Sequence, residues 1–158
     1  MAEFAPSTVG RQAPAHNRKR RTMDSRPQFD SRFLVGIEQV DREHLRIFEI
    51  AGRVHDSLLD GGAAALDAAR TAVAELLDYT ETHFASEEKL MEAAGYPELS
   101  AHRGLHRSLL AQARDMEMRV ELGERHVPVE LNRFITRWLI EHIEANDKKF
   151  GAFAQSRT

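Results

Sequence analysis

The sequence predicts an all-α protein, an up-down-up-down antiparallel four-helix bundle with a disordered N-terminal extension. Two observations predict this fold. Apolar residues after Ser31 recur with helical spacing, without the alternation typical of strands. Short breaks containing glycine or proline divide this region into four stretches of roughly 20 to 30 residues, long enough to lie side by side as rods. Because the breaks are short, neighbouring helices have to run antiparallel.

The extension is predicted over residues 1–30 and the helical domain over residues 31–158. The extension is rich in proline, serine, arginine and alanine, so it offers too little apolar surface to offset the entropy lost on ordering. It contains the basic run Arg18-Lys19-Arg20-Arg21. A solvated tail is the simpler interpretation of this run, and an electrostatic tether for anionic lipid, nucleic acid or a protein partner is the alternative.

The first two predicted helices end at breaks that contain glycine. The first covers residues 40–59, carries an apolar stripe and stops at Asp60-Gly61-Gly62, where glycine permits a positive φ. The second covers residues 63–94 and stops at Gly95-Tyr96-Pro97, with a glycine just past the end and a proline beyond it.

The last two predicted helices are marked in a similar way. The third begins at residue 98 or 100 and runs to Leu122. One face of it is apolar and consists of Leu105, Leu109, Ala113, Met116 and Val120. The fourth begins near Pro128, because proline suits the first turn of a helix, and runs to about Phe150, where Gly151 closes it.

Composition limits the classes of function. At 158 residues, of which 42% are apolar and 30% charged, the chain predicts one domain with one core. The absence of cysteine excludes disulfides, thiolate metal sites and cysteine nucleophiles, and fits a cytoplasmic location. No apolar run reaches the roughly 18 to 20 residues of a membrane span, so no membrane partner is expected. A net charge of -3 argues against a nucleic-acid partner, and a monomer is expected.

Seven histidine and carboxylate residues recur at spacings that fit a metal site inside the bundle. They are His44, His83, Glu87, His102, His106, His142 and Asp147. These residue types suit divalent first-row metals such as iron. His83 and Glu87 are four residues apart, so they share one helix face, and the same spacing joins His102 to His106. Every predicted helix therefore supplies at least one ligand.

The number of these residues matters, because a single inward histidine is more often a satisfied core residue than a ligand. Each such group costs several kcal/mol when it is buried without a partner. Two metal ions bridged by the carboxylates would pair all seven. Asp147 fits least well, since it follows His142 by five residues and lies about 140° away round an ideal helix. A local widening of the helix, or a bridging position reached from the side, would reconcile them, and widened turns are often found at functional sites.

Several short motifs surround this series. They are Val35-Gly36-Ile37, Val40-Asp41-Arg42-Glu43-His44, Thr82-His83-Phe84-Ala85-Ser86-Glu87-Glu88 with Met91 and Tyr96-Pro97, the pair His102 and His106, and Trp138-Leu139-Ile140-Glu141-His142 with Asp147. Together, over about residues 33–153, they closely resemble the hemerythrin family. The resemblance implies two iron ions (Fe2+/Fe3+) with a bridging oxide or hydroxide, which bind dioxygen reversibly.

The resemblance also implies a role for each ligand. His102, His106 and His142 would hold one iron, His44 and His83 the other, and Glu87 and Asp147 would bridge them. The second iron would keep an open position for dioxygen, beside an apolar pocket formed by Ile47, Trp138, Leu139 and Phe150. Core packing is the more economical interpretation of those four residues, and the two roles are compatible. Phe150 stands where the family often has tyrosine.

Other ionisable residues are expected to lie outside the site. Glu43 and Glu88 adjoin ligand positions and could accept hydrogen bonds from ligands, but exposure to solvent is the simpler expectation. His55 follows His44 by eleven residues, about 16 Å along the helix axis, and is assigned to the core edge or the surface. The remaining histidines, His16 and His126, are assigned to the extension and to a loop.

Three functions remain open. The favoured one is an oxygen carrier, store or delivery protein that is not an enzyme, since a site dominated by neutral imidazole disfavours the higher iron oxidation states. The chain also lacks the Glu-x-x-His motifs of ferritin-like di-iron enzymes. The first alternative is an oxygen or redox sensor that signals through its tail or a partner. The second is a di-iron enzyme that reduces peroxide or nitric oxide.

Overall fold

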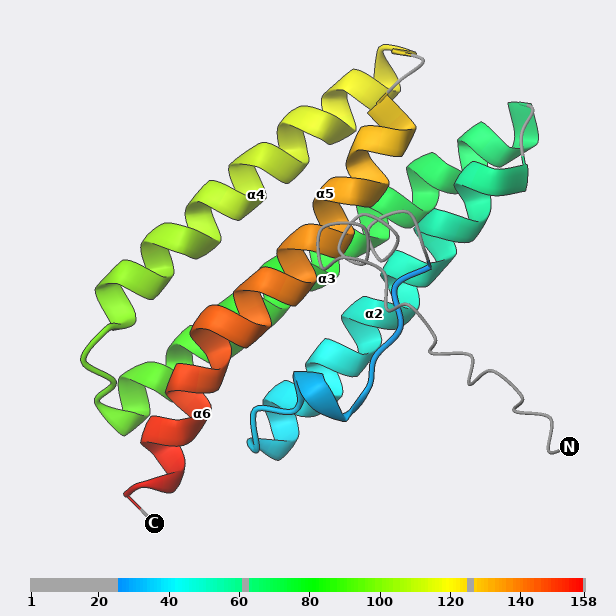
Figure 1. Cartoon of the computed structure of the whole chain (residues 1–158). Coiled ribbons are helices and arrows are strands. Elements are labelled where there is room, and N and C mark those ends of the chain that lie inside the picture. Colours follow the sequence, from blue (N-terminus) through cyan, green and yellow to red (C-terminus); the bar gives the residue numbers. More distant parts are fainter. Residues whose placement is uncertain (1–25, 61–62, 125–126, 158) are drawn as a thin grey trace, which may run out of the picture.

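The computed structural model of the chain describes residues 26–60, 63–124 and 127–157. Four long helices lie side by side with alternating directions, and the described residues include no strand (Figure 1). They are α2 (Glu38–Asp60), α3 (Ala63–Ala94), α4 (Leu99–Glu121) and α5 (Val127–His142), and the last continues through a π-helical turn, η2 (Ile143–Asp147), into α6 (Lys148–Gln155). The predicted all-α antiparallel bundle is confirmed.

Glycines end two of the helices as predicted. Gly95, with φ +67°, follows α3, and Gly123, with φ +77°, follows α4. Both angles lie in the left-handed region that glycine adopts without steric cost. The predicted break at Gly61-Gly62 lies outside the described residues. Among those described, no helix is both long enough and apolar enough to cross a lipid bilayer.

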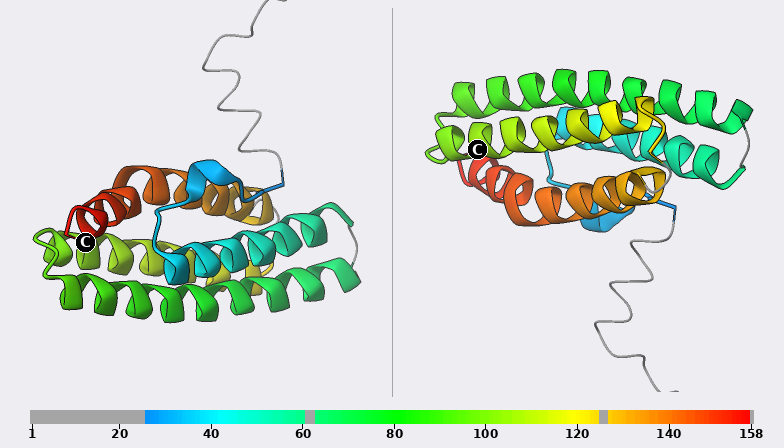
Figure 2. Two further views of the ribbon diagram at one scale, coloured as in Figure 1. Left: turned by 90° about the horizontal axis from the view of Figure 1, so that it is seen from below. Right: turned by 90° about the horizontal axis from the view of Figure 1, so that it is seen from above.

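A short N-terminal segment crosses the bundle before α2 begins (Figure 2). It includes a 3-10 turn, η1 (Ser31–Phe33), capped by the side chain of Asp30. Residues 1–25, which carry the basic run of the predicted extension, lie outside the described part of the chain. The extension's last residues are described and contact α2: Arg26 Nε donates to both oxygens of Asp56 at 3.0 Å. The Phe29 ring is partly buried and lies edge-on to the Phe48 ring, with the ring centroids 5.6 Å apart.

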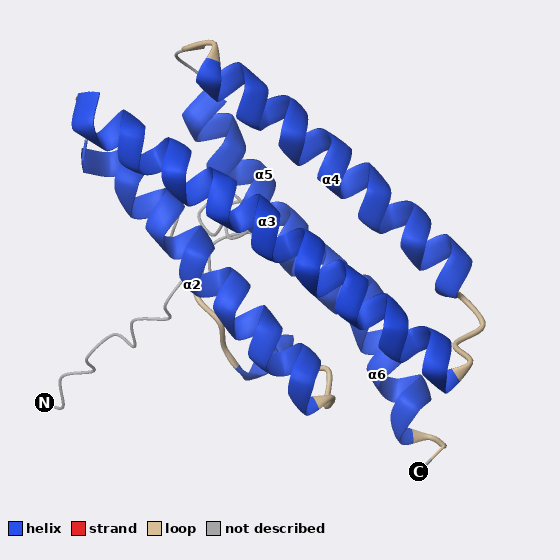
Figure 3. Cartoon of the chain, turned by 180° about the vertical axis from the view of Figure 1, so that it is seen from behind, coloured by secondary structure: helices blue, strands red, loops and turns tan. Residues whose placement is uncertain are grey.

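The core lies between the four helices, whose arrangement is seen from behind in Figure 3. Its fully buried side chains include Val40, Ile47, Ile50, Val54, Leu131, Ile135 and Ile143. The apolar face predicted for α4 is wrong at one position, since Leu105 is 42% exposed. His102 and His106 occupy the centre of the inward face of α4, and Leu105 lies about 60° to the side of His102 on an ideal helix.

The last helix does not stop at Gly151, contrary to the prediction, but continues to Gln155. Gly151 has a packing role instead. A Cβ atom at this position would lie 2.0 Å from the carbonyl oxygen of Val35, so only glycine lets the two backbones approach this closely. The Gln155 side chain donates to the same carbonyl at 3.3 Å. The helix that carries Asp147 is thereby fixed against the segment before α2.

We expect Gly151→Ala to destabilise the fold by about 1–3 kcal/mol, because the added methyl group forces the Val35 backbone to move. Gly104→Ala is the matched control within a helix, since its added Cβ would meet only the flexible Arg107 side chain of the same helix, at 3.9 Å. That control should be neutral or stabilising by about 0.5–1 kcal/mol. Urea unfolding of both variants measures the difference, and equal stabilities would contradict the close-approach account.

Candidate metal centre

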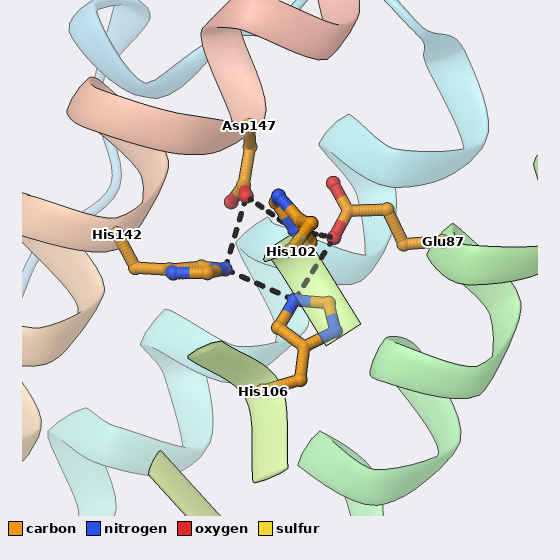
Figure 4. Close-up of side chains that lie close together, drawn as sticks. All are labelled: Glu87, His102, His106, His142 and Asp147. Carbon is orange, nitrogen blue, oxygen red and sulfur yellow. Dashed lines mark hydrogen bonds and ion pairs between the residues drawn. The ribbon is translucent and has the colours of Figure 1, made fainter. Parts of the chain in front are cut away.

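The structure brings all seven predicted ligands to the middle of the bundle. α2 supplies His44, α3 supplies His83 and Glu87, α4 supplies His102 and His106, and the α5–η2 rod supplies His142 and Asp147. All seven are buried, with at most 6% of the surface of any one exposed. Five of them form a tight cluster whose ligand atoms all lie within 4.8 Å of one another: Glu87, His102, His106, His142 and Asp147 (Figure 4).

Asp147 reaches the cluster because the helix widens just before it. The five residues of η2 form a π-helical turn in which the Lys148 N–H bonds to the Ile143 carbonyl, five residues earlier. In a regular α-helix, Asp147 would lie about 140° from His142. In the widened turn its Oδ1 lies 3.1 Å from His142 Nε2. The predicted local widening is therefore present and explains how both side chains face one point.

The two oxygens of Asp147 face different histidines. Oδ1 lies near His142 and, at 3.4 Å, near His102 Nε2, whereas Oδ2 lies 3.3 Å from His44 Nε2. His44 in turn packs edge-on against His83, with ring centroids 4.8 Å apart. Asp147 thus lies between a group of three histidines and a pair of two.

Glu87 brings a second carboxylate to the same group of histidines. Its Oε2 lies 3.3 Å from His102 Nε2 and 3.4 Å from His106 Nε2. The Nε2 atoms of His106 and His142 are 3.0 Å apart. Two ring nitrogens at this distance, beside two carboxylates, place several lone pairs around one small volume (Figure 4).

Several buried polar atoms at this point have no hydrogen bond of normal geometry. They are both ring nitrogens of His44, Oε1 of Glu87 and both oxygens of Asp147. A buried donor or acceptor left in this state costs about 1–3 kcal/mol, and more when it is charged. Metal ions would coordinate these atoms and neutralise both carboxylates. The residues present therefore fit a di-iron centre.

Two further glutamates orient histidines of the predicted ligand set, which corrects the expectation that these glutamates are exposed. Glu43 Oε2 lies 2.8 Å from Nδ1 of His83, and Glu88 Oε1 lies 2.9 Å from Nδ1 of His106. Both glutamates are half-buried. Because each ring donates its Nδ1 proton outward, its Nε2 lone pair is free to face the site. Each glutamate is next to a ligand in the sequence, but adjacency alone could not show that its side chain turns inward.

The ionisation of the cluster suits a cation. Burial and the charge of Asp147 would raise the pKa of Glu87, but the close approach of His102 and His106 outweighs both and lowers it to about 2. Burial would likewise raise the pKa of Asp147, but His142 and His44 hold it far below its usual range. Burial lowers the pKa of His106, which is therefore neutral at pH 7.

From these pKa shifts we expect the metal-free protein to lose stability as the pH falls. His106 has a pKa below its ordinary 6.5, so the unfolded chain binds more protons below that pH and stability falls. The ordinary pKa of Glu87 is 4.5, and its stabilising effect is lost as pH falls from there towards about 2. Thermal melts between pH 7.5 and 3 measure this. Glu87→Gln should show a shallower loss below pH 4.5, and identical profiles would contradict the assignment.

The four residues of the predicted dioxygen pocket are buried, but they do not lie in one cluster. Ile47, Trp138 and Leu139 belong to the main core. Phe150 packs with Met91 and Tyr96 in a second cluster. Trp138 also lines a small apolar cavity of about 10 Å³ between α3, α4 and α5. Their role as a ligand pocket stays a prediction, and their role in the core is evident.

The remaining histidines lie elsewhere, as far as they are described. The Nδ1 atom of half-buried His55 lies 3.2 Å from Asn132 Oδ1, on a neighbouring helix. This placement agrees with the core-edge assignment. His16 and His126 lie outside the described residues.

Comparison with known proteins agrees with this geometry. Residues 35–154 match the family model described as the hemerythrin HHE cation binding domain. This chain belongs to the hemerythrin family. The match extends from the segment before α2 into α6 and so includes every predicted ligand.

Hemerythrin relatives are found among both sequences and structures. A bacteriohemerythrin of Stenotrophomonas maltophilia is 34% identical over 116 residues, 73% of this chain and 73% of that protein. A bacteriohemerythrin of Pseudomonas aeruginosa is 38% identical over 113 residues, 72% of this chain and 71% of that protein. The crystal structure of a wild-type hemerythrin superposes with a TM-score of 0.69 at 29% identity, covering 76% of this chain and 90% of that one.

Proposed function

We propose that this hemerythrin is a non-haem di-iron protein that binds dioxygen reversibly and serves as an oxygen carrier, store or delivery protein. The observation that carries the proposal is the position of Asp147, whose two oxygens face two separate groups of histidines. A carboxylate in this position can bridge two metal ions.

The proposed ligand sets follow from that division. His102, His106 and His142 would hold one iron, and His44 and His83 the other, with Glu87 and Asp147 bridging. Two ferrous ions would supply the electrons by which dioxygen is held and released. The three-histidine iron has one protein ligand more than its neighbour, so the two-histidine iron would keep the open position.

The surrounding residues favour binding over further reaction. Ile47, Trp138, Leu139 and Phe150 are buried and apolar, and would keep water and protons from the iron pair. Glu43 and Glu88 accept hydrogen bonds from the Nδ1 atoms of His83 and His106 and so would keep those proposed ligands oriented. A cytoplasmic location and a monomeric state belong to the same proposal, and the absence of cysteine supports the first.

Metal analysis and an optical experiment test the proposal together. Protein reconstituted anaerobically should contain two irons per chain, and its absorption spectrum should change reversibly when the gas is cycled between argon and air. Irreversible oxidation within one cycle would contradict reversible binding. Zinc or manganese bound in preference to iron would contradict the cofactor. Turnover of peroxide or nitric oxide well above that of free iron would favour an enzyme instead.

A further inference from the structure

The two glutamates that orient ligand histidines make matching contacts with them. The distance from Glu43 to His83 Nδ1 is 2.8 Å and that from Glu88 to His106 Nδ1 is 2.9 Å. The glutamate side chains are also similarly exposed, at 18% and 22%. The two pairs differ in the partners of the second oxygen of each carboxylate.

The second oxygen of Glu43 accepts hydrogen bonds from two uncharged side chains. Ser86 Oγ donates to Glu43 Oε1 at 2.9 Å, and Gln39 Nε2 donates to the same oxygen at 3.1 Å. Gln39 also donates to Ser86 Oγ at 2.7 Å, which closes a ring of hydrogen bonds between α2 and α3. Neutral donors of this kind fix the carboxylate in place and leave its full negative charge.

The second oxygen of Glu88 accepts a hydrogen bond from a positively charged arginine side chain. Arg103 on α4 donates from Nε to Glu88 Oε2 at 3.1 Å, and its Nη2 donates to Glu92 at the same distance. The Arg103 side chain is 36% exposed, so water screens this ion pair in part. The guanidinium nevertheless neutralises part of the negative charge that faces His106, because Arg103 and His106 contact the same carboxylate.

We propose that Arg103 makes His106 a weaker metal donor than His83, and so sets a difference between the two iron positions. A carboxylate that accepts a ring proton raises the basicity of the ligating nitrogen. Glu43 does this to His83 at full charge, and Glu88 does it to His106 at a charge shared with Arg103. The ferric state is then favoured at the two-histidine iron, and the first electron added to a ferric pair goes to the three-histidine iron.

Arg103 acts through Glu88 and touches no ligand atom of the site, so it is a positioning residue. The expected change in iron potential rests on the proposed function. The expected change in the His106–Glu88 hydrogen bond rests only on the contacts described above. The test therefore needs one measurement without metal and one with iron.

The measurement without metal is the NMR resonance of the Nδ1 proton of each histidine. Arg103→Gln removes the cation, so the His106–Glu88 hydrogen bond should strengthen and the His106 proton should move downfield, with His83 unchanged. Arg103→Lys keeps the charge and should stay close to wild type. Ser86→Ala should move the His83 resonance alone. Arg107→Gln is the matched control, since it removes the same charge from an exposed position one turn later on α4.

The measurement with iron is a potentiometric titration of the same proteins. Arg103→Gln should make reduction of the three-histidine iron about tenfold less favourable, equivalent to about 59 mV for a one-electron couple. Arg103→Lys should restore most of this, and Arg107→Gln should change little. The proposal is wrong if Arg103→Gln moves neither the His106 resonance nor the potential, or if Arg107→Gln moves both equally. Wild-type protein that fails to load two irons would overturn the proposed function, while the NMR result would still decide on the role of Arg103.

Discussion

Replacing Asp147 with asparagine should abolish the two-iron site. Asparagine keeps the size of the side chain but lacks the charge that faces His44 on one side and His142 on the other, each within 3.3 Å. The variant should bind at most one iron per chain. It should also lose most of the rise in melting temperature that iron gives the wild type, a stabilisation of about 2.7 kcal/mol when free metal is at 100 times its dissociation constant.

The comparison of melting temperatures with and without iron separates metal binding from folding. Asp147→Asn also changes the metal-free protein, so only the difference between the two melts reports on coordination. His55→Ala is the control, because His55 is half-buried and contacts Asn132 rather than the cluster. That variant should keep two irons and the full rise. Wild-type iron content in Asp147→Asn would show that Asp147 is not a ligand.

Adding one residue to the π-helical turn should abolish iron binding, whereas removing one residue should preserve it. One extra alanine between Ala145 and Asn146 rotates everything after it by about 100°, which turns Asp147 away from His142 and Phe150 away from its cluster. Iron loading should be lost, and stability should fall. Deleting Ala145 instead converts the widened turn, which has one residue more than a regular turn, into an ordinary α-helical one. Asp147 then faces His142 with the four-residue spacing of the other ligand pairs.

We therefore expect the deletion to retain two irons and the insertion to retain none. Iron analysis and far-UV circular dichroism of the two variants measure this, since helix content should be close to wild type in the deletion. Loss of iron from the deletion would mean that the widened turn sets a distance that a regular helix cannot reproduce. Retention in the insertion would contradict the proposed role of the turn.

Much of the fold and the paired ligand positions follow from spacing alone, whereas Asp147 enters the predicted ligand set through the family resemblance. Helical periodicity and glycine-containing breaks are local properties, and they predicted the four helices and their order. The pair spacing of His83 with Glu87 predicted side chains on one face, which the structure bears out. Assignment of all seven residues as ligands remains a prediction that metal analysis has to test.

The errors arose where a residue's environment is set by distant parts of the chain. Gly151 looked like a helix stop, but its lack of a side chain serves a backbone contact with Val35. Leu105 was placed on the buried face of α4, but the two histidines occupy the centre of that face and leave it 42% exposed. Glu43 and Glu88 were expected in solvent, yet each accepts a hydrogen bond from a histidine on another helix. The partners of Gly151, Glu43 and Glu88 lie on other elements of the chain, and the exposure of Leu105 depends on which face of α4 the other helices cover.

The contact between Val35 and the C-terminal helix also has a consequence for the order of assembly. Gln155 and Val35 are 120 residues apart in the chain and meet beside the rod that carries Asp147. Closing so long a loop comes late in folding, because its entropy cost has to be offset by contacts already made. On the proposed ligand set, a chain whose last helix has not yet emerged from the ribosome presents five of the seven residues, without His142 or Asp147. An iron pair would then be held stably only after this last helix has emerged and packed against the others.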